Sequence, residues 1–169
     1  MNLLTSMARD ILNEHGYQMV LGEKDKEGLY TQVHLDSGFM GIALEADDDP
    51  REVILYVYLP EVVSENKHHT VMEYLTRVNY HLPMGHFEID LDAGKLRFVT
   101  GQIMEGNDLP ANVLLILMRN ALDRVETFFP GVLRIVHGNL HAVAALSEIE
   151  KKHGHAGRHA GSYASQRFN

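Results

Sequence analysis

The stretch over residues 71–102 constrains the fold more than any other part of the chain. It reads VMEYLTRVNYHLPMGHFEIDLDAGKLRFVTGQ. Its first part has apolar side chains at helical spacing and ends at a Pro-Met-Gly sequence, which stops a helix. Residues 86–91 and 95–102 alternate between apolar and polar side chains, as strands with one buried face do. This order of a helix and a hairpin indicates an α+β domain.

A turn centred on Ala93-Gly94 is expected to join the two strands of the hairpin. That turn sets Ile89 opposite Phe98, so that apolar side chains meet on the inner face. On the outer face it sets Asp90 opposite Arg97, which is a favourable pair of opposite charges. The acidic residues of the hairpin therefore have a structural reason to be there, and a catalytic role is not needed to explain them.

The rest of the chain is expected to complete one antiparallel sheet and the helices that pack on it. Asp47-Asp48-Asp49-Pro50 forms a turn, because it lacks the spacing of a calcium loop. Pro130-Gly131 is expected to separate the last two helices. The expected elements are helix 1–15, a weak strand 17–21, strands 29–35, 39–46 and 52–59, a helix starting between residues 66 and 70, the hairpin, helix 108–129 and helix 132–151.

A chain of 169 residues is long enough for one domain with a substantial core, and we place that domain at residues 1–150. Residues 151–169 are rich in Gly and His, lack periodicity and are expected to be a disordered tail. The net charge of −8 argues against nucleic acid as a partner. No apolar run approaches a membrane span, so we expect no membrane insertion. The absence of cysteine excludes disulfides and fits a cytoplasmic protein.

No motif for nucleophilic catalysis, phosphate binding or cofactor binding is present, so we predict no enzyme, no catalytic residue and no cofactor. One alternative is open, a metal-binding or small-molecule-binding protein, possibly an enzyme, built on His137 and His141. These two residues are spaced i,i+4 on a predicted helix, so both rings could reach one ion. The simpler interpretation is that they are exposed, unrelated histidines.

Two segments have the character of contact surfaces. Strand 52–59 is apolar on both sides, which is typical of a central strand or of a strand whose second face meets a partner. Its Tyr56 and Tyr58 are candidates for that second face, although half-buried tyrosines are common in any sheet. The helix that follows Pro110 is so apolar at its start that it is either sandwiched in the core or half of an interface. The candidate partner-binding residues are Tyr56, Tyr58, Leu115, Ile116 and Arg119.

The chain resembles the YbjN family of bacterial domains. The resemblance extends over residues 3–138 and rests mainly on residues 71–102. Members of that family show a helix that ends near an Asn, a Gly in the link, and a Gly-containing turn between two strands. The matching residues here are Val78-Asn79-Tyr80, Leu82, Gly85, Phe87 to Asp90, and Gly94 to Phe98. The chain departs from the family in its extra C-terminal helix and its Gly/His tail.

The resemblance implies the fold of the class I type III secretion chaperones: an α/β sandwich with one curved antiparallel sheet, helices packed on it, and elements in the order α-β-β-β-α-β-β-α, followed here by the extra helix. Its relatives include chaperones that hold extended segments of client proteins, sensory transduction regulators, and many dimers. The family offers no catalytic residue to carry over. The leading hypothesis is therefore a cytoplasmic homodimer that binds a client or regulatory partner protein, whose identity the sequence does not indicate.

Overall fold

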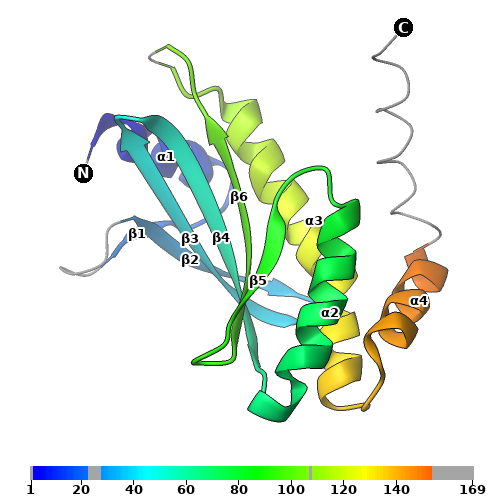
Figure 1. Ribbon diagram of the computed structural model, residues 1–169. Helices are drawn as coiled ribbons and strands as arrows, with labels where there is room; N and C mark the ends of the chain where they lie inside the picture. Colours follow the sequence, from blue (N-terminus) through cyan, green and yellow to red (C-terminus); the bar gives the residue numbers. More distant parts are fainter. Residues whose placement is uncertain (1, 23–27, 107, 154–169) are drawn as a thin grey trace, which may run out of the picture.

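Six antiparallel strands form one sheet in the order β1-β2-β3-β4-β6-β5 (Figure 1). The structure is a computed structural model that describes residues 2–22, 28–106 and 108–153. The strands are β1 Val20–Leu21, β2 Leu29–Leu35, β3 Gly38–Asp48, β4 Arg51–Val62, β5 His86–Asp90 and β6 Lys95–Ile103. The helices are α1 Leu3–Glu14, α2 Glu65–His81, α3 Ala111–Val136 and α4 Ala142–His153.

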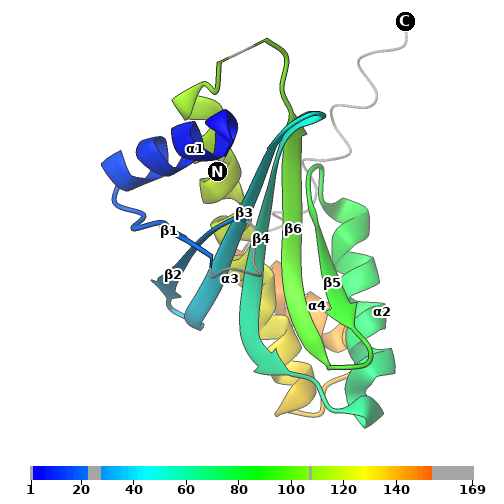
Figure 2. The same ribbon diagram turned by 90° about the vertical axis from the view of Figure 1, so that its left-hand side faces the viewer.

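The helices lie on one side of the sheet (Figure 2). Helix α3 packs against β4 and β6, α2 and α4 pack beside it, and α1 packs against β3 and α3. Within the described residues, no helix covers the opposite face of the sheet, which faces the viewer in Figure 2. We call this opposite face the open face.

The expected α+β class, the helix-covered antiparallel sheet and the element order are confirmed, and β1 adds one short strand where the weak candidate 17–21 was expected. Strand β4 is central in the sheet, which is one of the two interpretations that its two-sided apolarity left open. Its Val53, Leu55 and Val57 are at most 1% exposed and face the helices. The core is therefore a single layer between the sheet and the helices, and the side chains of the open face are not part of it.

The expected break at Pro130-Gly131 is wrong, because α3 runs through both residues to Val136. Proline lacks the N–H that closes a helical turn, which normally ends a helix. Here tertiary contacts outweigh that cost. The Tyr74 hydroxyl of α2 donates a hydrogen bond of 2.8 Å to the Phe128 carbonyl, and Gly131 packs directly against the Tyr74 ring. The chain turns instead after α3, where Asn139 takes a positive φ of 55°.

The register of the β5–β6 hairpin also differs from the expectation. Phe87, not Ile89, lies opposite Phe98, and Glu88, not Asp90, lies opposite Arg97. The observed pairing is shifted by two residues, and such a shift keeps every side chain on its expected face. The apolar alternation therefore cannot distinguish the two registers. The turn determines the register, because the Asp90 carboxylate accepts hydrogen bonds there from two backbone N–H groups.

The C-terminal end is only partly described. Helix α4 extends to His153 and so includes the first residues of the segment expected to be a tail. The remainder of that segment, residues 154–169, lies outside the described residues. Across the described part of the chain, no helix combines the length and the apolar character needed to cross a membrane.

Candidate functional site

The open face is built from two rows of side chains that cross the sheet at right angles to the strands. Both rows follow from the registers of the neighbouring strands, because side chains directly opposite each other share a face. The first, the aromatic row, consists of Val20, Tyr30, Ala43, Tyr56, Val99 and His86. The second, the ionic row, consists of Gln32, Gly41, Tyr58, Arg97 and Glu88.

The rows leave much apolar surface in contact with solvent. Val20 is 61% exposed and Tyr58 is 40% exposed, while Tyr30, Tyr56 and Val99 are half-buried. Half-buried tyrosines suit a protein interface, since the ring supplies apolar area and the hydroxyl keeps a polar contact. The open face therefore has the composition of a contact surface rather than that of an ordinary solvated sheet.

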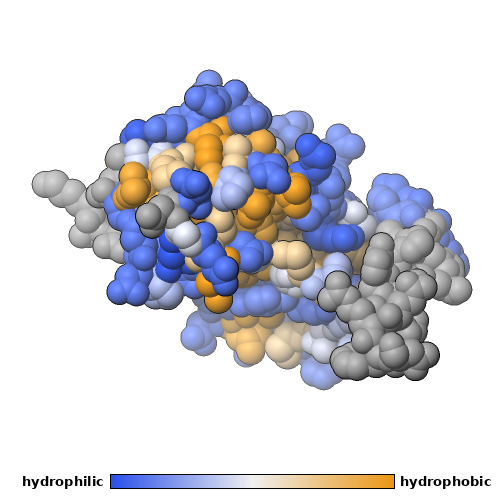
Figure 3. Space-filling model, turned by 90° about the horizontal axis from the view of Figure 1, so that it is seen from above, coloured by the Kyte–Doolittle hydropathy of each residue, from blue (hydrophilic) through white to orange (hydrophobic). Residues whose placement is uncertain are grey.

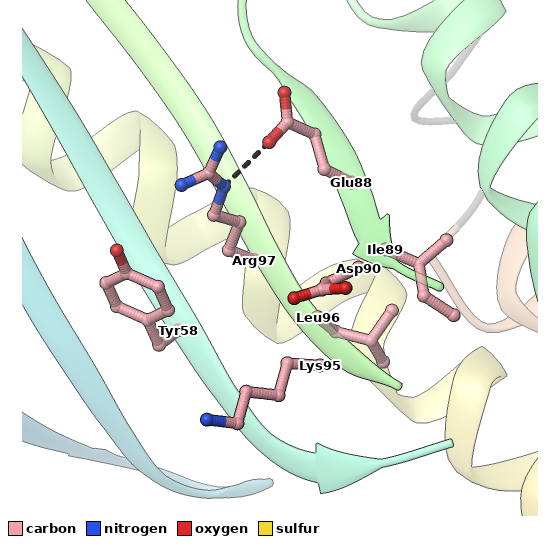
Figure 4. Close-up of a pocket in the computed structure, with 7 residues that line it drawn as sticks. All are labelled: Tyr58, Glu88, Ile89, Asp90, Lys95, Leu96 and Arg97. Carbon is pink, nitrogen blue, oxygen red and sulfur yellow. Dashed lines mark hydrogen bonds and ion pairs between the residues drawn. The ribbon is translucent and has the colours of Figure 1, made fainter. Parts of the chain in front are cut away.

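Arg97 is the centre of the ionic row. Its Nε lies 2.6 Å from Glu88 Oε2 (Figure 4). His86 Nε2 lies 2.8 Å from the other carboxylate oxygen of Glu88. Burial disfavours the charge on Glu88, but the hydrogen bonds from Arg97 and His86 outweigh it and hold the pKa of Glu88 below its ordinary value. Glu88 is thus a carboxylate held in place by its partners, which suits it poorly for donating a proton near neutral pH.

The two tyrosines of β4 form the aromatic centre of the face. Their rings stack with centroids 6.2 Å apart, and the Arg97 guanidinium carbon lies 4.8 Å from the Tyr56 ring centroid. The Tyr56 hydroxyl donates a hydrogen bond of 3.1 Å to Glu45. Burial, followed by the charge of Glu45, raises the pKa of the Tyr56 hydroxyl, so that hydroxyl stays protonated at neutral pH. These contacts fix the tyrosine rings before any partner arrives, which lowers the entropy cost of binding.

Two hollows meet at Tyr58. One, of about 590 Å³, lies over β5 and β6 and is lined by the ionic row from Tyr58 to Glu88 together with Asp90 and Lys95 (Figure 4). The other, of about 660 Å³, lies over β1 to β4 and is lined by Val20, Tyr30, Gln32, Gly41 and Tyr58, among others. Both have the size of sites that receive side chains or small ligands. Tyr58 is therefore the residue that joins the two halves of the open face.

The structure brings together only some of the residues that the sequence indicated. Tyr56 and Tyr58 lie side by side on the open face. Leu115, Ile116 and Arg119 lie instead on α3, which packs on the covered side of the sheet. Leu115 is half-buried, Ile116 is 52% exposed, and Arg119 is exposed. The expected partner-binding residues thus belong to two separate surfaces.

His137 and His141 do not share a helix, so the premise of the metal-binding alternative is wrong. His137 is the C-terminal cap of α3, and His141 lies in the link before α4. The spacing i,i+4 aligns two rings only within a continuous helix. His137 Nε2 lies 3.0 Å from Glu61. Among the described residues, no group of three His, Asp or Glu side chains is placed to hold a metal ion.

Three residues of the open face were not among the partner-binding residues predicted from the sequence: Tyr30, Glu88 and Arg97. The outward-facing residues of the alternating strands could have indicated them, if those residues had been compared across all strands of the sheet at once. Arg97 was recognised only as a charge partner in the hairpin. Its contact with Tyr56 depends on the β4–β6 pairing between segments far apart in the chain.

The sequence profile of the YbjN family, described as "Putative bacterial sensory transduction regulator", matches residues 8–134. The chain belongs to the YbjN family. No curated protein matches the chain. The family's description is that of a regulator and names no enzymatic reaction.

Two solved structures share the YbjN fold of this chain. A chain in the crystal structure of the ExsC–ExsE complex is 18% identical, with a TM-score of 0.52, and the match covers 76% of this chain and 94% of that one. The structure of "YbjN, a putative transcription regulator from E. coli" is 11% identical, with a TM-score of 0.54, and the match covers 72% and 85% of the two chains. At such low identities the likeness is one of fold.

The residues that carry the YbjN resemblance have structural roles here. The Asn79 side chain donates to the Phe87 carbonyl at 2.9 Å and accepts from the Phe87 N–H at 2.8 Å, and so pairs the outer edge of β5. Gly85 and Gly94 both take a positive φ, and a Cβ at Gly94 would overlap the Val63 carbonyl. These residues hold the hairpin against α2 and the end of β4, and the open face lies on the other side.

Proposed function

We propose that this YbjN domain is a non-enzymatic regulator or chaperone-type protein that binds a segment of a partner protein on its open sheet face. The observation that carries the proposal is a sheet of six strands with helices on one side and two ordered rows of side chains on the other. Exposed sheet faces with aromatic anchors and paired charges are typical of surfaces that bind proteins.

The contacts within the face support this role. The Tyr56–Tyr58 stack and the ion pair between Arg97 and Glu88 are contacts among the side chains of the face itself. A preformed surface of tyrosine and arginine matches the residue types that carry most of the binding energy at protein interfaces. The crystallised ExsC–ExsE complex, whose fold this chain shares, is itself an assembly of two proteins, which favours a protein as the ligand here.

We further infer that the protein is a cytoplasmic homodimer, in which Leu115, Ile116 and Arg119 on α3 contribute to the contact between two copies. Figure 3 supports this by showing apolar surface at the end of the molecule that carries the first turns of α3. The large exposed apolar side chains of this end are Leu3, Ile103 and Ile116. Such a contact would leave the tyrosines of the open face accessible to a partner protein.

Site-specific photocrosslinking in the native cell tests the proposed binding face. We would place a benzoylphenylalanine at position 58 on the open face, or at position 143 on α4, where Val143 is 55% exposed. We expect position 58 to crosslink to a discrete partner protein and position 143 to give none. Crosslinks to a partner from position 143 but not from position 58 would refute the open face as the binding surface.

A further inference from the structure

The hollow over Gly41 has a chemical character that goes beyond a general contact surface. We propose, on the basis of the proposed function, that this hollow receives a lysine or arginine side chain of the partner protein. The proposal rests on three features of the described residues: a glycine in the floor, tyrosines that line the hollow, and a carboxylate beside the tyrosines of this face.

The floor of the hollow is formed by β3. Gly41 and Ala43 are the two smallest side chains of the two rows, and they are neighbours on the open side of the same strand. Every other position of the two rows carries a side chain larger than alanine. Ala43 is only 2% exposed, whereas Gly41 lines the hollow of about 660 Å³, so the depression lies over Gly41.

Two tyrosines line the hollow, Tyr30 on β2 and Tyr58 on β4. On β2, Tyr30 and Gln32 lie opposite Ala43 and Gly41, respectively. On β4, Tyr56 and Tyr58 lie opposite the same two residues. A cationic side chain that enters such a space can lie over the face of a tyrosine ring, and the negative charge of that face attracts ammonium and guanidinium groups.

The charges around the hollow favour a cation over an anion. Glu45 follows Ala43 on the open side of β3, is exposed, and accepts the hydrogen bond from Tyr56. The nearest cation of the two rows, Arg97, is already paired with Glu88. An anionic ligand such as nucleic acid would be repelled here, whereas a basic segment would be attracted.

Three peptides provide the probe. They are acetylated and amidated, have the sequence Thr-Val-Xaa-Val-Thr, and carry Arg, Gln or Glu at the central position, so that only the charge and end group change. Titration into ¹⁵N-labelled full-length protein, followed by amide chemical shifts, reports both affinity and location. We expect the Arg peptide to shift the amides of Tyr30, Gly41 and Tyr58 and to bind about threefold or more tighter than the Gln peptide. The Glu peptide should bind more weakly than either.

Two substitutions at Gly41 distinguish a loss of the hollow from a loss of folding. A Cβ at this position would lie 3.6 Å from the Tyr58 Cβ, an ordinary contact, so Gly41→Ala is the matched control for folding. Gly41→Val fills the depression and should abolish the shifts at Tyr30 and Tyr58, while Gly41→Ala should only reduce them. Glu45→Gln should bring the affinities for the Arg and Gln peptides closer together.

Equal affinities for the Arg and Gln peptides would overturn the inference of a basic side chain, and so would an absence of shifts in the two rows. Neither result would refute the proposed function, which is decided by the crosslinks from positions 58 and 143. An unchanged response in Gly41→Val would show that the peptides bind away from the hollow, and would overturn the inference as well.

Discussion

At the scale of single residues, Asn79 shows how one side chain completes the edge of a sheet. Its amide both donates to and accepts from the backbone of Phe87, as a neighbouring strand would. The outer edge of β5 would otherwise present these groups to solvent, and free edges invite pairing with another chain. Asn is suited to this task because its side chain contains one donor group and one acceptor group, like the peptide unit.

Asn79→Asp is expected to destabilise the protein by about 1–3 kcal/mol, since it removes the donor and sets a carboxylate against the Phe87 carbonyl. Urea unfolding followed by circular dichroism measures the change. The matched control is Asn120→Asp, at an exposed position of α3, which should stay within about 0.5 kcal/mol of wild type. Equal losses in the two variants would argue against the edge-pairing role.

Glu88 leads to a pH dependence of stability. Its pKa in the folded protein lies below the ordinary value of 4.5, because the hydrogen bonds from Arg97 and His86 outweigh its burial. A carboxylate whose pKa is lower in the folded protein stabilises the fold at pH values above its ordinary pKa. That stabilisation is lost as the pH falls through the pKa of the folded protein. The pair is partly exposed, so its contribution at neutral pH is expected to be at most about 1 kcal/mol.

Glu88→Gln should therefore flatten the loss of stability between about pH 5 and pH 3 relative to wild type. Unfolding free energies from urea titrations at several pH values provide the measurement. Glu150→Gln, which removes an exposed carboxylate on α4, serves as the control and should leave the wild-type profile unchanged. The idea fails if Glu88→Gln follows the wild-type profile through this range.

At the scale of elements, the crossing of α2 and α3 determines how the helical layer packs. Gly131 lies where the two helices approach most closely, and Tyr74 of α2 fills the space that a side chain there would need. The Tyr74 hydroxyl is buried, and its hydrogen bond to Phe128 ties the two helices together next to Pro130. The same contact thus keeps a proline and a glycine inside a helix, although both residue types normally disfavour one.

Gly131→Ala is expected to cost about 1–3 kcal/mol, because the new methyl group would overlap the buried Tyr74 side chain. By helix propensity alone the same change should stabilise α3 by up to about 1 kcal/mol, so the sign of the effect separates the two causes. Chemical unfolding gives the sign directly. A more stable Gly131→Ala protein would mean that α2 and α3 do not approach as closely as described.

At the scale of the whole molecule, the protein presents two surfaces of different character. The open face carries stacked tyrosines, paired charges and two hollows, whereas the end that includes the first turns of α3 carries exposed apolar surface (Figure 3). A dimer formed through α3 leaves the tyrosines free in both copies. Two basic segments, or one long one, could then be bound by the same assembly, with the gain in avidity that two linked sites give.

We expect Ile116→Lys to convert a dimer into a monomer, since it places a charge in an apolar contact. Multi-angle light scattering would then report about 19.1 kDa in place of twice that mass. The matched control is Val143→Lys on α4, where an equally exposed apolar side chain lies outside the proposed contact. A wild-type protein that is monomeric at all accessible concentrations would refute the dimer.

Local patterns in the chain were enough to predict the strands, their inward faces, the first two helices and the family. Periodicity is a local property, so the pattern at Val53, Leu55 and Val57 was enough to predict a strand and its buried face, and the residues around Asn79 and Gly94 were enough to indicate YbjN. The pair of Tyr56 and Tyr58 was also visible, since alternation placed both on the second face of one strand.

The hairpin register, the continuity of α3 and the composition of the site could not be predicted from the sequence patterns. A two-residue shift leaves the alternation unchanged, so the alternation does not identify the residue that lies opposite Arg97. The turn that begins at Asp90 determines that pairing. Pro130 stays helical because of Tyr74, which is far away in the chain. The hollow over Gly41 exists because strand pairing sets small residues of β3 between tyrosines of β2 and β4. The last two depend on contacts between distant segments, which no local pattern in the chain records.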